Sequence, residues 1–128
     1  MERSEYKLAT YYITSDIFEY PNSYNKIVEL NLVDFDVWYL MESGQATRRY
    51  FDLKERYPDR KLIPFARQDA TDDIACFEIG KGTKIQLIHD FATEGFEQKY
   101  EFEDLWAWLE FAIKEMVFYN RCEDVECK

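Results

Sequence analysis

The chain has 128 residues, of which 47% are hydrophobic and 18% aromatic, with only four Gly and three Pro. This length is typical of one domain, and the composition provides a large core and excludes a low-complexity or disordered chain. The formal net charge of −10 excludes nucleic-acid binding through the general surface, while it fits either solubility alone or attraction of a basic protein.

A helix over residues 24–32 is the first predicted element, because apolar side chains recur there after the weakly patterned residues 1–20. Pro21 marks a turn, and Asn22 and Ser23 are candidate helix caps, since their side chains accept hydrogen bonds from the first helical N–H groups. The helix is therefore expected to begin directly after this turn.

Residues 33–41 come next, and they alternate apolar with acidic side chains before becoming continuously apolar. This pattern predicts a strand that ends at Leu40 or Met41. Residues 42–57 show one apolar and one charged side at helical spacing, and Pro58 follows them. A surface helix that stops before this proline is therefore expected.

Three strands are predicted in the centre of the chain. Residues 61–67 form a short strand whose proline indicates an edge or a bulge, and the acidic turn 68–73 follows it. Residues 74–79 and 84–90 form two further strands, joined by a glycine-containing hairpin turn at 80–83.

The last predicted element is an amphipathic helix of about 18 residues. Its apolar side chains recur at helical spacing, at Leu105, Trp108, Leu109, Ala112, Ile113, Met116 and Val117. Glu103 and Asp104 fall at its start, where the helix dipole favours negative charge. Antiparallel hairpins with helices before and after them predict a single α+β domain, with a central, mostly antiparallel sheet and flanking helices.

The expected compartment is the cytoplasm. Residues 1–7 are charged and precede no apolar run, so no signal peptide is expected, and no uncharged apolar run is long enough to predict a membrane span. The cysteines, an odd number, are Cys76, Cys122 and Cys127. They fit reduced thiols better than a disulfide framework; a Cys122–Cys127 bridge is conceivable, but nothing in the sequence requires it.

Several motifs, taken in their order and spacing, resemble one known family. The main ones are Arg56-Tyr57-Pro58-Asp59-Arg60-Lys61-Leu62-Ile63-Pro64-Phe65-Ala66, Asp72-Asp73-Ile74-Ala75-Cys76-Phe77, Ile88-His89-Asp90-Phe91-Ala92 and Phe102-Glu103-Asp104-Leu105-Trp106-Ala107-Trp108-Leu109. Upstream of them stand Tyr20-Pro21-Asn22-Ser23-Tyr24, Leu32-Val33-Asp34-Phe35 and Trp38-Tyr39. Together they resemble the SUKH superfamily, which is named partly after a fungal regulator of cell-wall glucan synthesis.

The resemblance covers roughly residues 20–118, which leaves 1–19 as an N-terminal extension and 119–128 as a C-terminal tail. It implies an α+β domain with a central antiparallel sheet. Bacterial members of this family are commonly immunity proteins that neutralise a toxin domain, often a nuclease, and fungal members are regulators and interaction hubs. This chain departs from the family in its short N-terminal region and in the absence of Gly from the turn at 69–73.

Catalysis would require a nucleophile and a base, and the sequence offers few candidates. His89 stands next to Asp90, as a base and its orienting partner would, or as a histidine that caps the end of a strand. Cys76 lies within an apolar strand, where a thiol is usually a small core group. The prediction is that the chain is not an enzyme.

The acidic turn is a candidate metal site. Asp69, Asp72, Asp73 and Glu78 could supply oxygen ligands, but their spacing matches no EF-hand loop. A solvated turn with local backbone hydrogen bonds explains the same residues. No bound metal and no cofactor are therefore expected.

The acidic stretch 94–104 and the turn at 69–73 are the candidate contact surface for a protein partner. The candidate residues are Asp69, Asp72, Asp73, Glu94, Phe96, Glu97, Tyr100, Glu101 and Glu103. Aromatic side chains within a charged rim are typical of protein interfaces. The alternative is a solvated loop whose Phe96 is buried in the core.

The predicted function is therefore a non-enzymatic immunity protein that binds a basic toxin domain, without contacting nucleic acid or a membrane. One alternative is a small enzyme or ligand-binding regulator that uses Asp72, Asp73 and His89. Another alternative is a general interaction scaffold, which would bind by the same physical means.

Overall fold

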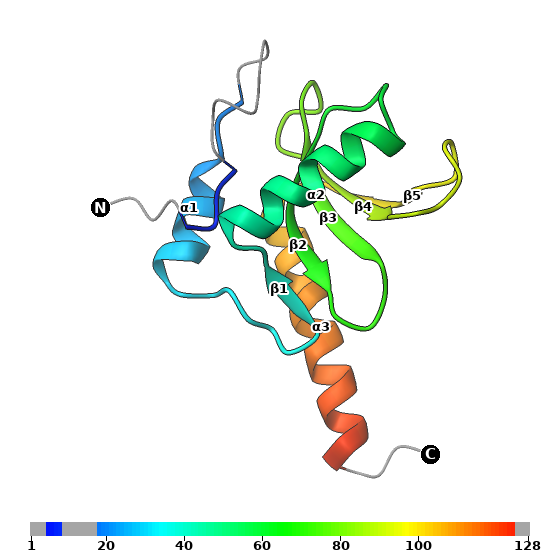
Figure 1. Ribbon diagram of the computed structural model, residues 1–128. Coiled ribbons are helices and arrows are strands. Elements are labelled where there is room, and N and C mark those ends of the chain that lie inside the picture. The colour runs from blue at the N-terminus through cyan, green and yellow to red at the C-terminus, as the bar shows by residue number, and fades with distance from the viewer. Residues whose placement is uncertain (1–4, 9–17, 125–128) are drawn as a thin grey trace.

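Five strands, β1 (Trp38–Leu40), β2 (Leu62–Gln68), β3 (Asp73–Glu78), β4 (Ile85–His89) and β5 (Gln98–Phe102), form one antiparallel sheet (Figure 1). They follow one another across the sheet in chain order. Three helices, α1 (Asn22–Glu29), α2 (Ser43–Arg56) and α3 (Leu105–Asp124), complete the α+β single-domain arrangement that the sequence predicted.

This computed structural model describes residues 5–8 and 18–124. Most of the predicted N-terminal extension, residues 1–19, and the last four residues of the predicted tail lie outside the described residues. Within the described part of the chain, no helix combines the length and the apolar character needed to cross a membrane.

Helices cover both faces of the sheet. In Figure 1, α2 lies across the near face of the sheet, while α3 crosses the far face and its C-terminal half extends past the strands. Alternate side chains of a strand point to opposite faces. In β3, Phe77 therefore faces the side of α1 and α3, and Cys76 and Glu78 face the side of α2.

Aromatic rings fill the core between the sheet and α3. The ring of Trp108, which is fully buried, lies 4.9 Å from that of Phe65 and 5.7 Å from that of Trp38. Phe65 lies 4.7 Å from Phe77 and 5.7 Å from Tyr24 of α1. Edge-to-face pairs of this kind add stability beyond the area that they bury. The predicted core position of Trp108 is confirmed.

The predicted central strands are confirmed with small changes in their ends. The proline in β2 does mark a bulge, since the register with β3 shifts between Pro64 and Ala66. α2 also matches its prediction, and it buries Ala46, Tyr50 and Leu53 against the sheet.

In the N-terminal half one prediction is wrong, and another is confirmed only at its C-terminal end, Leu40. Neither Asn22 nor Ser23 caps α1, because Pro21 occupies the N-cap position and no side chain bonds to the first turn. The strand predicted for 33–41 is shortened to β1, because Asp36 has a φ of 70° and the chain turns there.

The C-terminal third holds one element that was not predicted and one helix that differs from its prediction. β5 was not predicted, because its polar and acidic residues have no apolar alternation. The apolar stripe predicted along α3 is fully buried only in its first half, since Ile113 and Val117 are each 38% exposed. Asp104 caps α3, since the Ala107 N–H donates to its Oδ1 at 2.9 Å.

Candidate functional site

The connection between β4 and β5, residues 90–97, is held at both ends by buried carboxylates. It begins at Asp90, which is fully buried, and ends at Glu97, which is 6% exposed. Between them the side chains of Phe91 and Phe96 project into solvent and are 61% and 79% exposed. We call residues 90–97 the display loop.

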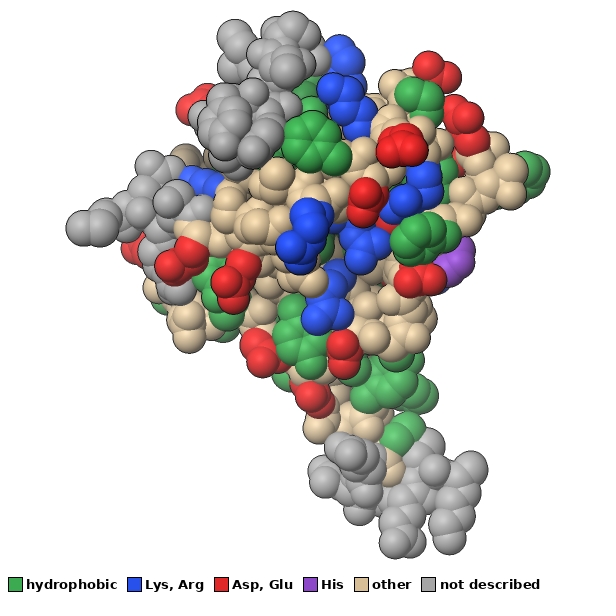
Figure 2. All heavy atoms as spheres, viewed as in Figure 1, with side chains coloured by type: hydrophobic (Ala, Val, Ile, Leu, Met, Phe, Trp, Pro, Cys, Tyr) green, Lys and Arg blue, Asp and Glu red, His purple; other side chains and the backbone are tan. Residues whose placement is uncertain are grey.

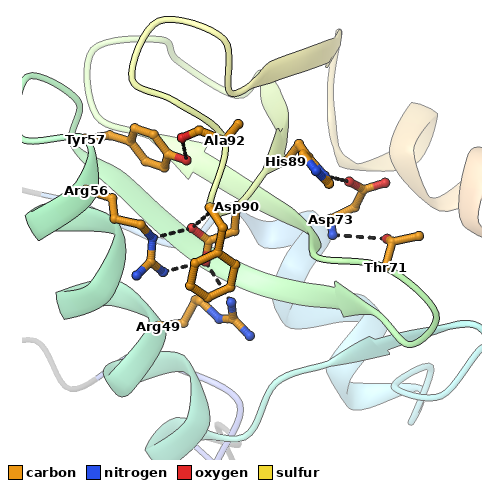
Figure 3. Close-up of polar contacts among 9 residues, drawn as sticks. Arg49, Arg56, Tyr57, Thr71, Asp73, His89, Asp90 and Ala92 are labelled. Carbon is orange, nitrogen blue, oxygen red and sulfur yellow. Dashed lines mark hydrogen bonds and ion pairs between the residues drawn. The ribbon is translucent and has the colours of Figure 1, made fainter.

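Asp90 is bound by two arginines from α2. Arg56 donates from Nε to Oδ1 and from Nη2 to Oδ2, both at 2.7 Å, and Arg49 donates from Nη1 to Oδ2 at 2.7 Å (Figure 3). Burial would raise the pKa of the Asp90 carboxyl, but the hydrogen bonds from the arginines outweigh it and the net pKa lies below its ordinary value. The carboxylate is therefore ionised and fixed in place.

Glu97 holds the other end of the display loop. Arg60 donates from Nη1 to its Oε2 at 3.0 Å, and the Gly95 N–H donates to its Oε1 at 2.7 Å. Burial would raise the pKa of Glu97, but hydrogen bonds, including those from Arg60 and Gly95, lower it overall. Arg60 also forms a two-pronged ion pair with Glu78 of β3.

The first turn of the display loop has a strained backbone, which several contacts hold in place. Phe91 has a φ of 70°, in the left-handed region that bulky side chains rarely adopt. Its N–H donates to Asp90 Oδ1 at 2.8 Å, and the guanidinium of Arg56 lies 4.1 Å from its ring centroid. The Tyr57 hydroxyl donates to the Ala92 carbonyl at 2.7 Å (Figure 3). Strain of this kind persists only where surrounding contacts impose it, and it concentrates at functional sites.

Most of the predicted contact residues are exposed, but they do not all lie beside this loop. The turn at 69–73 does, since the Asp72 carbonyl accepts from the Asp90 N–H, whereas Glu103 follows the opposite end of β5, next to the hairpin that joins β3 to β4. Glu94, Asp69, Asp72 and Glu103 are exposed, and Tyr100 of β5 is 58% exposed. Phe96 is not a core residue, so the alternative of a buried Phe96 is excluded. Glu101 is exposed too, and its pKa is lowered by a hydrogen bond from Gln86.

Two residues of the predicted surface are buried, which corrects their expected place in a solvated acidic face. Glu97 is held by Arg60 as described, and Asp73 is 6% exposed. Asp73 receives Lys99 Nζ on Oδ2 at 2.7 Å and contacts His89 Nδ1 through Oδ1 at 2.9 Å. Both carboxylates are occupied by partners within the chain.

The catalytic candidates are not arranged as the sequence suggested. His89 contacts Asp73 and not Asp90 (Figure 3), while Asp72 contributes only its carbonyl, which accepts from the Asp90 N–H. Cys76 points to the opposite face of the sheet from Asp73, its strand neighbour three residues away. Burial raises the pKa of its thiol well above the ordinary value, so the thiol is protonated.

Among the residues that the structure describes, no three His, Cys, Asp or Glu side chains converge as they would around an ion. The acidic turn at 69–73 is instead organised by local hydrogen bonds, with Thr71 Oγ1 accepting from the Asp73 N–H and Gln68 Oε1 accepting from the Ala70 N–H.

The arginines that support the display loop were missed by sequence reasoning. Figure 2 shows that Lys and Arg side chains gather in one band on the face that carries α2. Arg49 and Arg56 are seven residues apart in the helix, and this spacing places them on one side of it, two turns apart. That spacing was a usable signal, but the sequence does not show that Asp90 would reach them.

Comparison with protein-family models, with curated proteins and with solved structures finds no match for this chain. The display loop and the surface around it are therefore the features from which a function is inferred.

Proposed function

We propose that this protein is a non-enzymatic immunity protein of the cytoplasm, which binds a basic toxin domain and blocks it. The observation that carries the proposal is the display loop, in which two buried ionic clusters hold a segment that exposes two phenylalanines, one of which, Phe91, has a strained backbone conformation. An exposed Phe side chain does not stabilise the isolated domain, since burial of its apolar area is what would be favourable. Such a side chain is useful when a partner buries it.

The rigidity of the loop favours binding. Ordering a flexible loop on binding costs free energy, so a loop that is already fixed retains more of its contact energy. Phe91, Phe96 and Tyr100 provide aromatic anchors. Glu94 provides a charged rim together with Asp69 and Asp72 of the adjacent turn. This is the usual anatomy of a protein interface.

The charge of the chain supports a basic partner. The formal net charge is −10, and residues 61–128, which include the display loop, contain 15 acidic and 8 basic residues. Complementary charge accelerates encounter and disfavours acidic partners, whereas buried aromatic contacts lengthen the life of the complex. A nuclease domain, whose own substrate is polyanionic, has the required basic surface. The SUKH-like motifs support the same function.

A ligand-binding regulator is the second candidate, because the structure brings Asp73 and His89 of that hypothesis into contact. Asp72 does not join them through its side chain. A scaffold without a dedicated toxin would use the display loop as an immunity protein does, so protection of a poisoned cell distinguishes the two.

The test uses the toxin domain encoded by the reading frame next to this one. Coexpression should restore growth of cells that express the toxin, and the purified proteins should form a one-to-one complex. Phe91→Ala combined with Phe96→Ala should abolish protection while the domain stays folded, with a thermal melt lowered only slightly by loss of the contact between Arg56 and the Phe91 ring. Protection by the folded double variant, or the absence of a toxin-encoding neighbour, would contradict the proposal.

Charge reversal tests the steering role of the rim. Glu94→Lys with Asp72→Lys should slow association at low salt and reduce its salt dependence, because surface charges are screened beyond ~8–10 Å in physiological salt. Glu29→Lys with Glu42→Lys changes the net charge equally, and both positions are exposed and lie toward the β1 edge of the sheet. This control should alter association much less. Equal effects of the two pairs would show that net charge alone steers the encounter.

A further inference from the structure

A cavity of about 520 Å³ lies on the α3 side of the sheet, between its β4–β5 end and the exposed half of α3. Its size is that of a typical ligand pocket. The lining residues used below are Leu87, Tyr100 and Phe102 from the sheet and Phe111, Glu115 and Tyr119 from α3. None of these residues belongs to the display loop.

Four aromatic side chains line the cavity: Tyr100, Phe102, Phe111 and Tyr119. Tyr100 and Phe102 lie 4.7 Å apart between ring centroids, and Phe102 and Phe111 lie 5.1 Å apart. Tyr119 adds a ring that is 42% exposed at the outer side. The faces of such rings carry partial negative charge, so they attract cations.

The charges of the cavity leave one carboxylate without a cation. Lys99 and Asp73 both line the cavity and pair with each other at 2.7 Å. Glu115 Oε1 accepts a hydrogen bond from Trp38 Nε1 at 2.7 Å. No Lys, Arg or His among the described residues forms an ion pair with Glu115. The cavity therefore has a net negative charge beside its aromatic wall.

We propose that this cavity binds a guanidinium group, namely the side chain of an arginine. A guanidinium is planar and weakly hydrated, so it stacks on aromatic rings, and its N–H groups bind a carboxylate. Glu115 Oε2 is the acceptor for it, while Tyr119 and Phe111 supply the stacking faces. That the arginine comes from a basic protein partner rests on the function proposed above; the preference for a guanidinium does not.

The test is an NMR titration of the whole ¹⁵N-labelled chain with N-acetyl-arginine amide. N-acetyl-citrulline amide is the matched control, because citrulline has nearly the same shape and no charge. The arginine compound should shift the amide signals of Tyr100, Phe111, Glu115 and Tyr119 in a saturable manner. The citrulline compound should bind about tenfold more weakly, as expected for the loss of a charged hydrogen bond. Equal binding of both compounds, or no saturable shift, would overturn the proposal.

Glu115→Gln isolates the charge of the carboxylate. A glutamine Oε1 still accepts from Trp38 Nε1, so the fold is retained, and affinity for the arginine compound should fall about tenfold. Glu110→Gln is the control, since Glu110 is an exposed residue of the same helix that does not line the cavity. Binding that is unchanged in Glu115→Gln would overturn the assignment.

N-acetyl-glutamate amide provides a third arm of the titration. Saturable binding of this anion in place of arginine would assign the cavity to carboxylates through Lys99 and would also overturn the proposal. These measurements need no toxin. Failure of the cavity proposal therefore leaves the immunity function to be judged by its own protection assay, and a failed protection assay leaves the guanidinium preference intact.

Discussion

The two faces of the sheet are stabilised in different ways. On the α1 and α3 face, aromatic rings such as Trp108, Phe65 and Phe77 contact one another with almost no polar groups between them. On the α2 face, by contrast, arginines bind buried carboxylates: Arg49 and Arg56 bind Asp90, and Arg60 binds Glu78 and Glu97.

The two faces therefore have different roles: one mainly stabilises the fold, and the other positions the display loop. Apolar burial is non-directional and scales with area, so the aromatic face mainly stabilises the fold. Ion pairs with buried carboxylates are directional, and their desolvation offsets much of their attraction. The α2 face therefore contributes less net stability for its number of contacts. What it provides is the fixed geometry of the display loop.

Trp108→Ala should give the largest loss of stability. Trp108 is fully buried among Phe35, Trp38 and Phe65, and truncation of a large core aromatic costs about 3–5 kcal/mol. Urea denaturation followed by circular dichroism measures the free energy of unfolding. Trp106→Ala is the matched control, since Trp106 is 46% exposed on the same helix.

The Trp106 variant should lose less than about 1 kcal/mol. If Trp108→Ala were as stable as Trp106→Ala, the aromatic face would not be the main source of stability, and the comparison of the two faces would fail. Trp108→Phe sharpens the test. The indole Nε1 of Trp108 is buried without a hydrogen-bond partner among the described residues, so replacement by Phe removes a buried unpaired donor.

Asp90→Asn should have the next largest effect, because it leaves the guanidinium groups of Arg49 and Arg56 without a counter-charge. Breaking a buried pair in this way costs roughly 3 kcal/mol at the lower end of the usual range, which suits arginines that are 23% and 27% exposed. Unlike Trp108→Ala, it should also increase hydrogen exchange of the Phe91 and Ala92 amides more than that of the central strands. If Asp90→Asn increased hydrogen exchange equally in the loop and in the central strands, Asp90 would not position the loop.

Much of the fold was readable from the sequence because apolar periodicity reports burial directly. β3 and β4 are continuously apolar or alternating, and α2 has a clear apolar side, so each was predicted close to its observed bounds. β5 was missed because an exposed edge strand needs no apolar alternation. The turn at Asp36 was missed because its geometry depends on a hydrogen bond from its own N–H to Asp34 Oδ1, which no periodicity reports.

The candidate site was only partly readable. Glu94 and Tyr100 are exposed, as their place in the predicted contact surface requires, whereas the sequence left open whether Phe96 is exposed or buried in the core. The burial of Asp73 and Glu97 was not foreseen, because a carboxylate is buried only when a cation from elsewhere in the fold reaches it. Arg60 lies 37 residues from Glu97 in the chain, so their pairing is a property of the folded sheet.

The pH dependence of stability should distinguish the buried carboxylates of the α2 face from the acidic side chains that are exposed on the surface. The pKa of Asp90 is lowered in the folded protein, so its ionised form stabilises the fold above the unfolded pKa of about 4. That stabilisation is lost as the pH falls through the lower folded value. The difference in unfolding free energy between parent and Asp90→Asn should therefore be constant above about pH 5 and shrink below about pH 4.

Asp59→Asn is the control for this pH series, since Asp59 is exposed. Its difference from the parent should stay small, because substitution of an exposed residue changes stability little. A gap between parent and Asp90→Asn that widened in acid would show that the arginines do not favour the ionised carboxylate.

Phe96→Ala should change stability least, by less than about 0.5 kcal/mol, because 79% of this side chain is already exposed to water. If the loop exists to present it, the same substitution should raise the dissociation rate of the toxin complex, while association, which the acidic rim controls, stays nearly constant. Ile113→Ala is a matched control, since Ile113 is an exposed apolar residue on α3. Binding kinetics on an immobilised toxin domain, with thermal melts of each variant, separate these effects. Dissociation that is unchanged by Phe96→Ala would mean that the ionic face fixes the loop for a reason other than the display of this ring.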